Sequence, residues 1–184
     1  MLKGHRCYLN LGIAGIQHLH NEIGAAQNKQ PIAHRDIKSR NILVSNEGTA
    51  VIADLGLALR LDEFLGPKTN GLQARLKDSG PETEDRKIGT TRYMSPEVLT
   101  NTLDATKFES YKQSDIYSLA LVLWEIISRT TNDINEFNPG SYMLPYAQQL
   151  RCRSIFGANP TVVQMKAEVV EDGFRPLFSG FGGK

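Results

Sequence analysis

The stretch Ile32–Gly56 reads IAHRDIKSRNILVSNEGTAVIADLG. We expect the rest of the chain to pack around this stretch and hold it in place. Two short apolar runs, 42–44 and 50–53, flank the turn Asn46-Glu47-Gly48. This pattern predicts an antiparallel hairpin. Asn41 comes just before the first run and Asp54 just after the second. Because both ends of a hairpin lie together, we expect these two side chains to be neighbours.

A further carboxylate, Asp36, precedes Asn41 in the segment His34-Arg35-Asp36. Two carboxylates and an amide oxygen are the ligands that Mg²⁺ prefers, and Mg²⁺ often bridges to phosphates. The residues therefore predict a phosphoryl-transfer centre. Taken singly, each feature has an ordinary explanation: Asp-x-Gly is usually a turn, Asn before a strand a cap, and Arg-Asp a surface ion pair. Their order and spacing favour the catalytic interpretation.

His-Arg-Asp, then Asn, a hairpin and Asp-x-Gly together resemble the catalytic loop and metal-binding turn of protein kinases. The resemblance implies that Asp36 accepts the proton of the substrate hydroxyl and that Lys38 places a positive charge beside the transferred phosphate. It also implies ATP as the nucleotide and Mg²⁺, or alternatively Mn²⁺, as the metal. Asn41 and Asp54 would hold the metal, and Lys38 would contact the nucleotide. A lysine at position 38 is more typical of serine/threonine than of tyrosine kinases.

A second stretch, IGTTRYMSPE at 88–97, resembles the substrate-docking loop and A-P-E motif of the same family. The resemblance implies that Thr90 lies beside Asp36 and Lys38 in substrate docking, and that Glu97 gives structural support. Ser95-Pro96-Glu97 also predicts a helix start by its own chemistry. The long segment 54–97 would be an activation segment. Its candidate phosphorylation sites are more simply ordinary loop hydroxyls: Thr69, Ser79 and Thr83.

Helices are expected on either side of these motifs. Ser114–Ser128 begins with a capping residue and is apolar on nearly every side, which predicts a central buried helix. By resemblance, Asp115 gives structural support through hydrogen bonds to the His-Arg-Asp backbone; otherwise it is a negative charge at a helix N-terminus. Residues 8–23 predict a second helix, in which His18 and His20 are expected at the surface rather than in a metal site. Residues 162–170 predict a third, amphipathic helix.

The composition fits one soluble domain. The chain has 184 residues, 40% of them hydrophobic and 22% charged, which are ordinary values for a globular protein. A net charge of +1 gives no reason to expect a nucleic-acid partner. Leu119–Trp124, the longest apolar run, falls far short of the roughly 20 residues that span a bilayer, so no transmembrane segment is expected in this chain.

Several longer stretches narrow the resemblance to receptor serine/threonine kinases of the transforming growth factor-β superfamily: 34–44, 52–61, 88–99 and 108–126. YMLPY at 142–146 is similar to the activin and type II branch, whereas Asp54-Leu55-Gly56 is usual in type I members. Taken together, the chain resembles the type II branch more than type I. The resemblance implies the cytoplasmic portion of a single-pass plasma-membrane receptor. It would act within a receptor hetero-oligomer and phosphorylate a type I receptor on Ser or Thr.

No Gly-rich phosphate loop, strand Lys or partner Glu of a kinase small lobe is recognised in the sequence. The expected fold is therefore mainly α with a small β-hairpin, the large (C-terminal) lobe of a protein-kinase-like fold. We expect a partial kinase domain at 1–177, without the small lobe, and a disordered or truncated tail at 178–184. One alternative is a catalytically inactive binding module or decoy. Another is a metal hydrolase using Asp36, Asn41 and Asp54, which leaves 89–97 and Asp115 unexplained.

Overall fold

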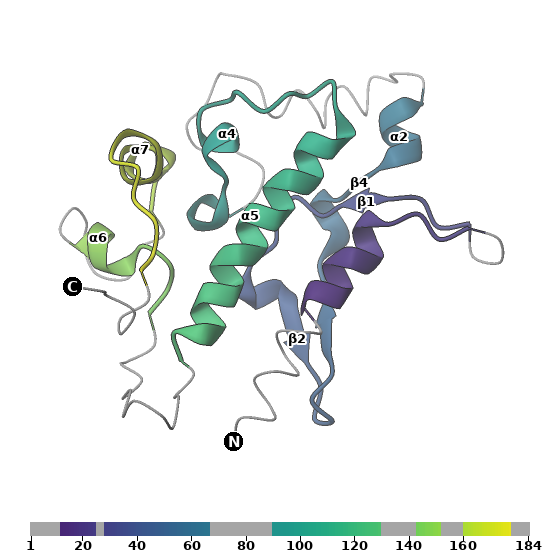
Figure 1. The fold of residues 1–184 in the computed structure, drawn as a ribbon, viewed down its shortest axis with the longest axis horizontal. Coiled ribbons are helices and arrows are strands. Elements are labelled where there is room, and N and C mark those ends of the chain that lie inside the picture. Colours follow the sequence, from purple (N-terminus) through teal and green to yellow (C-terminus); the bar gives the residue numbers. More distant parts are fainter. Residues whose placement is uncertain (1–11, 25–27, 67–89, 130–142, 152–159, 178–184) are drawn as a thin grey trace.

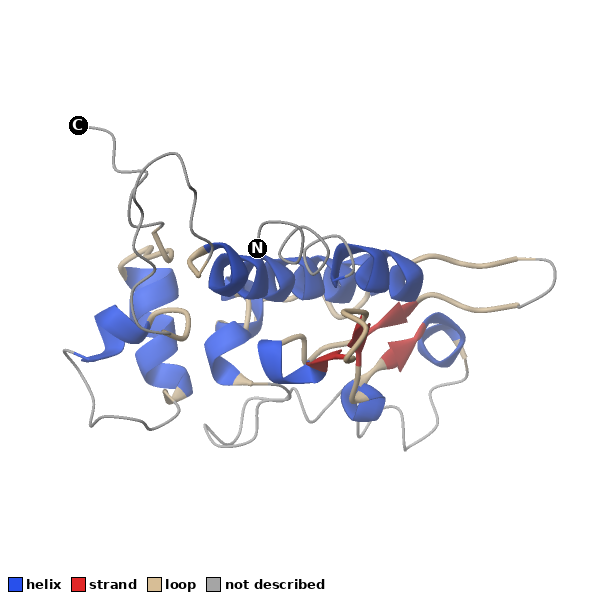
Figure 2. Cartoon of the chain, turned by 90° about the horizontal axis from the view of Figure 1, so that it is seen from below, coloured by secondary structure: helices blue, strands red, loops and turns tan. Residues whose placement is uncertain are grey.

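A computed structural model describes residues 12–24, 28–66, 90–129, 143–151 and 160–177. Helices form most of this part of the chain, and the strands make two small two-stranded antiparallel sheets (Figure 2). The prediction of a mainly α fold with a β-hairpin is confirmed. The candidate phosphorylation sites Thr69, Ser79 and Thr83 and the expected tail at 178–184 lie outside the described residues. No helix in the described ranges is long and apolar enough to cross a membrane.

The central helix, α5, spans Phe108–Ile127 and crosses the middle of the molecule (Figure 1). It begins six residues before the predicted start at Ser114 (114 − 108 = 6). A turn at Asp104 directly precedes the first residue of α5. The Asp104 carboxylate stabilises this turn, because it accepts from the Thr106 amide at 3.0 Å and forms an ion pair with Lys107 at 2.9 Å. The Thr106 hydroxyl and then Lys107 lower the pKa of Asp104 to about 2. Ser114 is not a cap; its hydroxyl lies 3.0 Å from that of Ser95.

One face of α5 forms the main core, but the helix is not buried all round. Leu119, Leu121 and Val122 are at most 5% exposed, whereas Ile116 is 50% exposed among the described residues. The core they enter is shared by the helix at 12–20 and the C-terminal helical segment, and its other members include Ile16, Ile37, Leu99, Met165 and Val169. The predicted all-round burial is therefore wrong on the side that carries Ile116.

The helix at residues 12–20 ends at His20, three residues before the predicted end at Ile23 (23 − 20 = 3). Lys29 closes this end, since its ammonium group donates to the carbonyl oxygens of Leu19 and Asn21, both at 2.9 Å. Burial lowers the pKa of Lys29. Ile23 instead forms an antiparallel β-bridge with Lys29.

The predicted hairpin is formed by β2, Ile42–Val44, and β3, Ala50–Ile52, with Leu43 opposite Val51. Its turn depends on Gly48, whose φ of 83° lies in the left-handed region. A second pair was not predicted: β1, Ile32–Ala33, pairs with β4, Leu59–Arg60. The two strand pairs fix the ends of the segments 34–41 and 53–58. These two segments contain most of the candidate site.

Short helices complete the described chain. They are η1 (Ser39–Asn41), η2 (Leu55–Leu57), α2 (Leu61–Leu65), η3 (Thr91–Tyr93), α4 (Pro96–Leu99), α6 (Ala147–Arg151), α7 (Val162–Lys166) and the π-helical η4 (Ala167–Glu171). Thr161 and Gln164 form a capping box before α7, so the predicted helix at 162–170 is confirmed. Pro96 begins α4, as the sequence predicted.

Candidate active site

The Asp36 carboxylate is the centre of a compact hydrogen-bond cluster, and the residue is only 8% exposed. Its Oδ1 accepts from the amide and the hydroxyl of Thr90, at 2.8 and 2.9 Å. Its Oδ2 lies 2.5 Å from Lys38 Nζ. Lys38 Nζ also donates to Thr90 Oγ1 at 2.8 Å, so the three side chains form a closed triangle. Thr90 therefore lies beside Asp36 and Lys38, as the resemblance implied, although 54 positions separate it from Asp36 (90 − 36 = 54).

Asn41 is buried beside Asp36, and its side-chain amide nitrogen faces Asp36. Nδ2 donates to the Asp36 carbonyl oxygen at 2.9 Å and to Oδ2 at 3.3 Å. These oxygens can only accept, and this fixes which end of the Asn41 amide faces them. The side-chain oxygen of Asn41 accepts no hydrogen bond from the described residues, so it is available to a ligand.

Asp54 lies at the same end of the hairpin as Asn41. The Ala53 amide donates to the Asn41 carbonyl at 2.8 Å, and Asp54 follows directly. Its backbone is left-handed, with φ 67° and ψ 70°, a conformation that costs a non-glycine residue of order 1–3 kcal/mol. The carboxylate is exposed, and among the described residues it accepts only from the Gly56 amide, at 3.4 Å. Such strain is typical of functional turns.

Asp115 of α5 anchors the loop that carries Asp36. Its carboxylate is 1% exposed and accepts from the backbone amides of His34 and Arg35, both at 2.7 Å. Arg35 is held at φ 68°, in the left-handed region. The predicted hydrogen bonds of Asp115 are present, and they explain why this strained turn persists.

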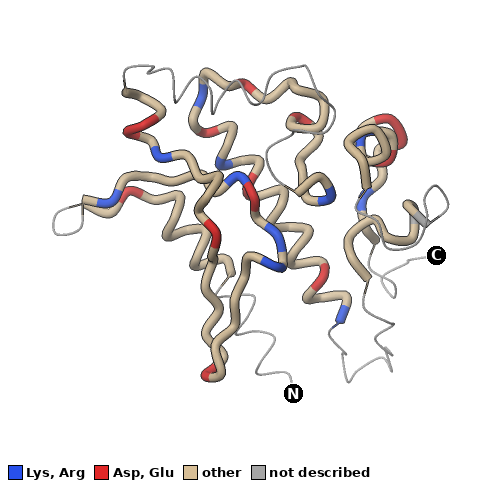
Figure 3. The backbone as a smooth tube through the Cα atoms, turned by 180° about the vertical axis from the view of Figure 1, so that it is seen from behind, with Lys and Arg blue, Asp and Glu red and all other residues tan. Residues whose placement is uncertain are grey.

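His34 links the two halves of the candidate site. Its Nδ1 accepts from the Asp36 amide at 3.3 Å, so Nε2 carries the proton and donates to the Ala53 carbonyl at 3.0 Å. The loop before Asp36 and the residue before Asp54 are thus joined through one buried ring. Figure 3 shows basic and acidic positions close together at the centre of the molecule.

The oxygen donors of Asn41 and Asp54 suit a hard divalent cation. The described residues contain no cluster of three or more His, Cys, Asp or Glu side chains that could hold a metal alone. Mg²⁺ commonly binds through one or two protein oxygens and completes its shell with water and phosphate oxygens. An amide oxygen with no hydrogen bond from the described residues and an exposed carboxylate fit that kind of site.

Three contacts around the site were not predicted. His20, expected at the surface, is 8% exposed, and its Nε2 lies 2.9 Å from Asp115 Oδ2. It comes four residues after the buried Ile16, and this spacing was the available signal that both share the buried face. Tyr93 donates to Glu125 at 2.6 Å and lies 3.1 Å from the Ser39 hydroxyl, which connects the segment after Thr90 to η1.

Glu97 contributes through its backbone. Its carbonyl oxygen accepts from the amides of Thr102 and Leu103, at 2.9 and 3.2 Å, which closes the turn after α4. Within the described ranges no ion pair to its carboxylate is found. The support expected from its side chain stays a prediction.

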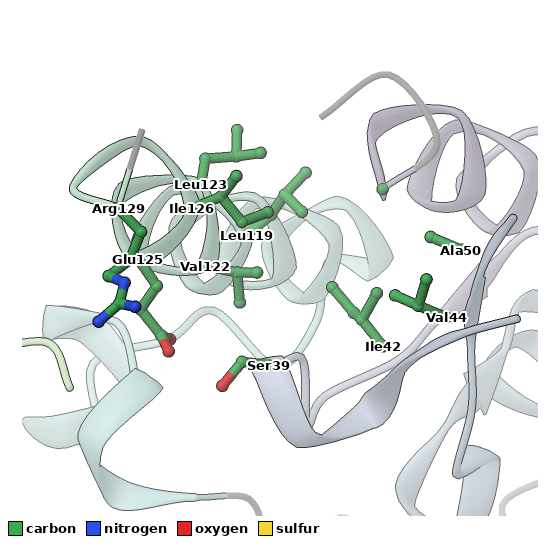
Figure 4. A pocket seen from close by; sticks show the side chains of 11 residues that line it. Ser39, Ile42, Val44, Ala50, Leu119, Val122, Leu123, Glu125, Ile126 and Arg129 are labelled. Carbon is green, nitrogen blue, oxygen red and sulfur yellow. The ribbon is translucent and has the colours of Figure 1, made fainter. Parts of the chain in front are cut away.

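Behind the hairpin lies a mostly apolar pocket of about 340 Å³. Ile42, Val44 and Ala50 line one wall. The apolar residues that line the other wall come from α5: Leu119, Val122, Leu123 and Ile126 (Figure 4). Glu125 and Arg129 stand at one end of it, near Ser39. The pocket lies on the α5 side of the hairpin.

Known proteins are similar to this chain over most of its length. A sequence model described as "Protein kinase domain" matches residues 5–138. Human TGF-beta receptor type-1 is 40% identical over 164 residues, 89% of this chain and 28% of that protein. Human activin receptor type-1C is 42% identical over 170 residues, 91% of this chain and 30% of the relative.

Rat TGF-beta receptor type-2 is 39% identical over 170 residues, 91% of this chain and 26% of the receptor. The chain thus spans less than a third of the length of these curated relatives. Types 1 and 2 are matched almost equally, so the greater similarity to the type II branch stays a prediction.

Proposed function

This chain belongs to the protein kinase family, and from that premise we propose that it provides the catalytic and metal-binding loops of a receptor serine/threonine kinase. The reaction is the transfer of the γ-phosphoryl group of ATP to a Ser or Thr hydroxyl of a protein. The observation that carries the proposal is the hairpin end, where Asn41 and Asp54 lie together while Asn41 also contacts Asp36.

Asp36 accepts the proton of the substrate hydroxyl in this proposal. Its two oxygens are oriented by Thr90 on one side and by Lys38 on the other, so the carboxylate is held before the substrate arrives. Lys38 offers its positive charge to the transferring phosphate, where preorganised charge lowers the barrier. Thr90 bonds to both groups and frames the acceptor residue.

Asn41 and Asp54 hold Mg²⁺, with Mn²⁺ as the substitute metal. When bound, the ion would neutralise phosphate oxygens of ATP. Asn41 presents its amide oxygen because its nitrogen is bound to Asp36. Asp54 presents a solvent-facing carboxylate from a left-handed turn.

The test joins this chain to the small lobe of TGF-beta receptor type-1 and measures transfer of labelled phosphate from ATP to a protein substrate. We expect Asp36→Asn and Asp54→Asn each to lower kcat by about 10²–10⁴-fold, the range for loss of an acid–base or charge-stabilising group. Asp62→Asn is the matched control, since Asp62 is exposed and pairs with Arg60. Undiminished activity in both site variants would reject the proposed roles.

For the whole protein we propose a single-pass plasma-membrane receptor whose cytoplasmic part contains this chain and phosphorylates a type I receptor within a hetero-oligomer. The support is the similarity to receptors of both types. The joined kinase is offered the cytoplasmic part of a type I receptor whose own catalytic Asp has been replaced. Phosphate on Ser or Thr of that substrate is expected, and labelling of tyrosine alone would contradict the assignment.

A further inference from the structure

Residues 90–95 form the docking segment, which brings Thr90 to Asp36, and Arg92 lies within it. Arg92 is only 7% exposed, and its Nη1 donates to the Pro145 carbonyl oxygen at 2.8 Å. The two residues are 53 positions apart (145 − 92 = 53), so this bond joins the docking segment to the segment before α6. We propose that Arg92 is a positioning residue for the acceptor protein in the phosphoryl transfer of the proposed function, on which this inference rests.

The burial of Arg92 indicates more than packing. A buried guanidinium group is costly unless hydrogen bonds replace its hydration. An apolar side chain would fill the same space without that cost. The guanidinium group adds direction, because its donors lie in one rigid plane and orient the carbonyl group that accepts from them. The bond therefore fixes where the docking segment lies relative to Pro145.

The peptide group that Arg92 holds belongs to a strained turn. Tyr146, the residue after Pro145, is 1% exposed and has φ 62°, in the left-handed region that a non-glycine residue rarely adopts. Rotation about this angle would swing the Pro145 carbonyl, so the bond from Arg92 opposes relaxation of the turn. The Tyr146 hydroxyl lies 2.7 Å from that of Tyr117 on α5, which restrains the same turn through its side chain. The docking segment and the turn thus stabilise each other.

The path from Arg92 to the proposed proton acceptor is one helical turn long. Arg92 belongs to η3, whose N-cap is Thr90, and the Tyr93 amide donates to the Thr90 carbonyl at 2.9 Å. The Thr90 amide and hydroxyl in turn bind Asp36 Oδ1. The proposed metal ligands belong to the ends of the hairpin instead. A loosened docking segment should therefore weaken binding of the acceptor protein and leave ATP binding unchanged.

Variants at one position separate positioning from simple packing. Arg92→Met keeps similar length without a donor, and Arg92→Lys keeps one donor group. Arg60→Met is the matched control, since Arg60 is exposed and pairs with the exposed Asp62.

Amide hydrogen exchange in the 184-residue chain reports on the two joined segments. The Tyr93 amide closes η3, and the Ala147 amide closes the strained turn by donating to Leu144 at 3.0 Å. We expect Arg92→Met to speed exchange at both amides about tenfold or more relative to the core residue Val122, and Lys to restore part of the protection. Equal exchange in the Met and Lys variants, or faster exchange spread equally to Val122, would overturn the proposal.

The chain joined to a small lobe gives the kinetic test. We expect Arg92→Met to raise KM for the protein substrate about tenfold while KM for ATP stays unchanged, with Arg60→Met close to the parent. An equal rise in both KM values, or an unchanged KM for the protein substrate, would contradict the positioning role.

If the Met variant does not fold, the side-chain NMR spectrum of the parent chain decides. Slow exchange of the Arg92 Nη protons supports the bond to Pro145, and exchange as fast as at the exposed Arg60 contradicts it. An inactive parent fusion would count against the proposed function, while the exchange data would still decide the role of Arg92.

Discussion

Thr90 contributes two donors to one oxygen of Asp36 and one acceptor to Lys38, so its hydroxyl orients both groups at once. Thr90→Val keeps the shape and the backbone donor but removes the hydroxyl. In the chain joined to a small lobe we expect kcat to fall about 10–100-fold, the consequence of losing one orienting contact in a catalytic centre. Thr90→Ser retains the hydroxyl and is expected to stay within about threefold of the parent. Equal kcat values for Val and Ser would contradict the orienting role.

The site residues differ in how well their positions in the structure can be predicted from the sequence. Asp36, Asn41 and Asp54 stand close together in sequence, so a hairpin and a loop suffice to predict their neighbourhood. The partner of His20 is Asp115, a residue 95 positions away, and the only local signal that distinguishes His20 from the exposed His18 is its four-residue spacing from the buried Ile16. The position of Thr90 beside Asp36 could be given only by resemblance, because the intervening segment has no local pattern that fixes its path.

At the scale of elements, the hairpin of β2 and β3 brings Asn41 and Asp54 to one end, and Gly48 permits its turn. Gly48 has φ 83° and Gly24 lies outside the left-handed region, yet an added Cβ would meet no atom at either position. Gly48→Ala is expected to lower the free energy of unfolding by about 1 kcal/mol for backbone reasons alone. Gly24→Ala is the control and should not destabilise the chain. Urea unfolding midpoints that coincide for the two variants would contradict this account of the turn.

The contact between α5 and the segment before α6 is sensitive to high pH. Tyr117 and Tyr146 share a hydroxyl–hydroxyl contact of 2.7 Å, and burial is the main cause that raises the pKa of both. The unfolded chain releases these protons near pH 10 and the folded chain above it, so stability present below about pH 10 is lost as pH rises further. Denaturant titrations should show this fall, and Tyr146→Phe should make it shallower. A stability independent of pH between 9 and 11 would contradict this prediction.

Elements were predicted where their pattern is local and missed where partners are distant. The turn with Gly48 predicted β2 and β3 from local sequence. In contrast, β1 and β4 are two residues each, and their paired residues are 28 and 26 positions apart (60 − 32 = 28, 59 − 33 = 26). The start of α5 was placed at Ser114 because Ser is a common cap. That hydroxyl instead contacts Ser95, the residue before α4, and the turn at Asp104 precedes the earlier start. Tertiary contacts outweighed local capping preference in this helix.

At the scale of the whole molecule, the proposed catalytic loops occur without a recognisable Gly-rich phosphate loop in the 184 residues. Leu43, Val51 and Leu55 on and beside the hairpin are each at least 50% exposed in the described structure. We expect the purified 184-residue chain to show negligible phosphate transfer, and joining a small lobe to raise it by orders of magnitude. If every joined form stayed inactive, the binding-module alternative would replace the kinase proposal. Robust turnover by the purified chain would contradict the need for a second lobe.

The proposed phosphoryl transfer depends on a divalent cation that the amide oxygen of Asn41 and the carboxylate of Asp54 hold beside Asp36. Mn²⁺ tests it directly, since it replaces Mg²⁺ and broadens NMR signals of nearby nuclei. Titrating Mn²⁺ into the 184-residue chain, alone and with ATP, should broaden signals of Asn41, Asp54 and Gly56 first. Asp54→Asn should abolish this broadening and Asp62→Asn should leave it intact. Broadening centred elsewhere, or unchanged in Asp54→Asn, would contradict the claim.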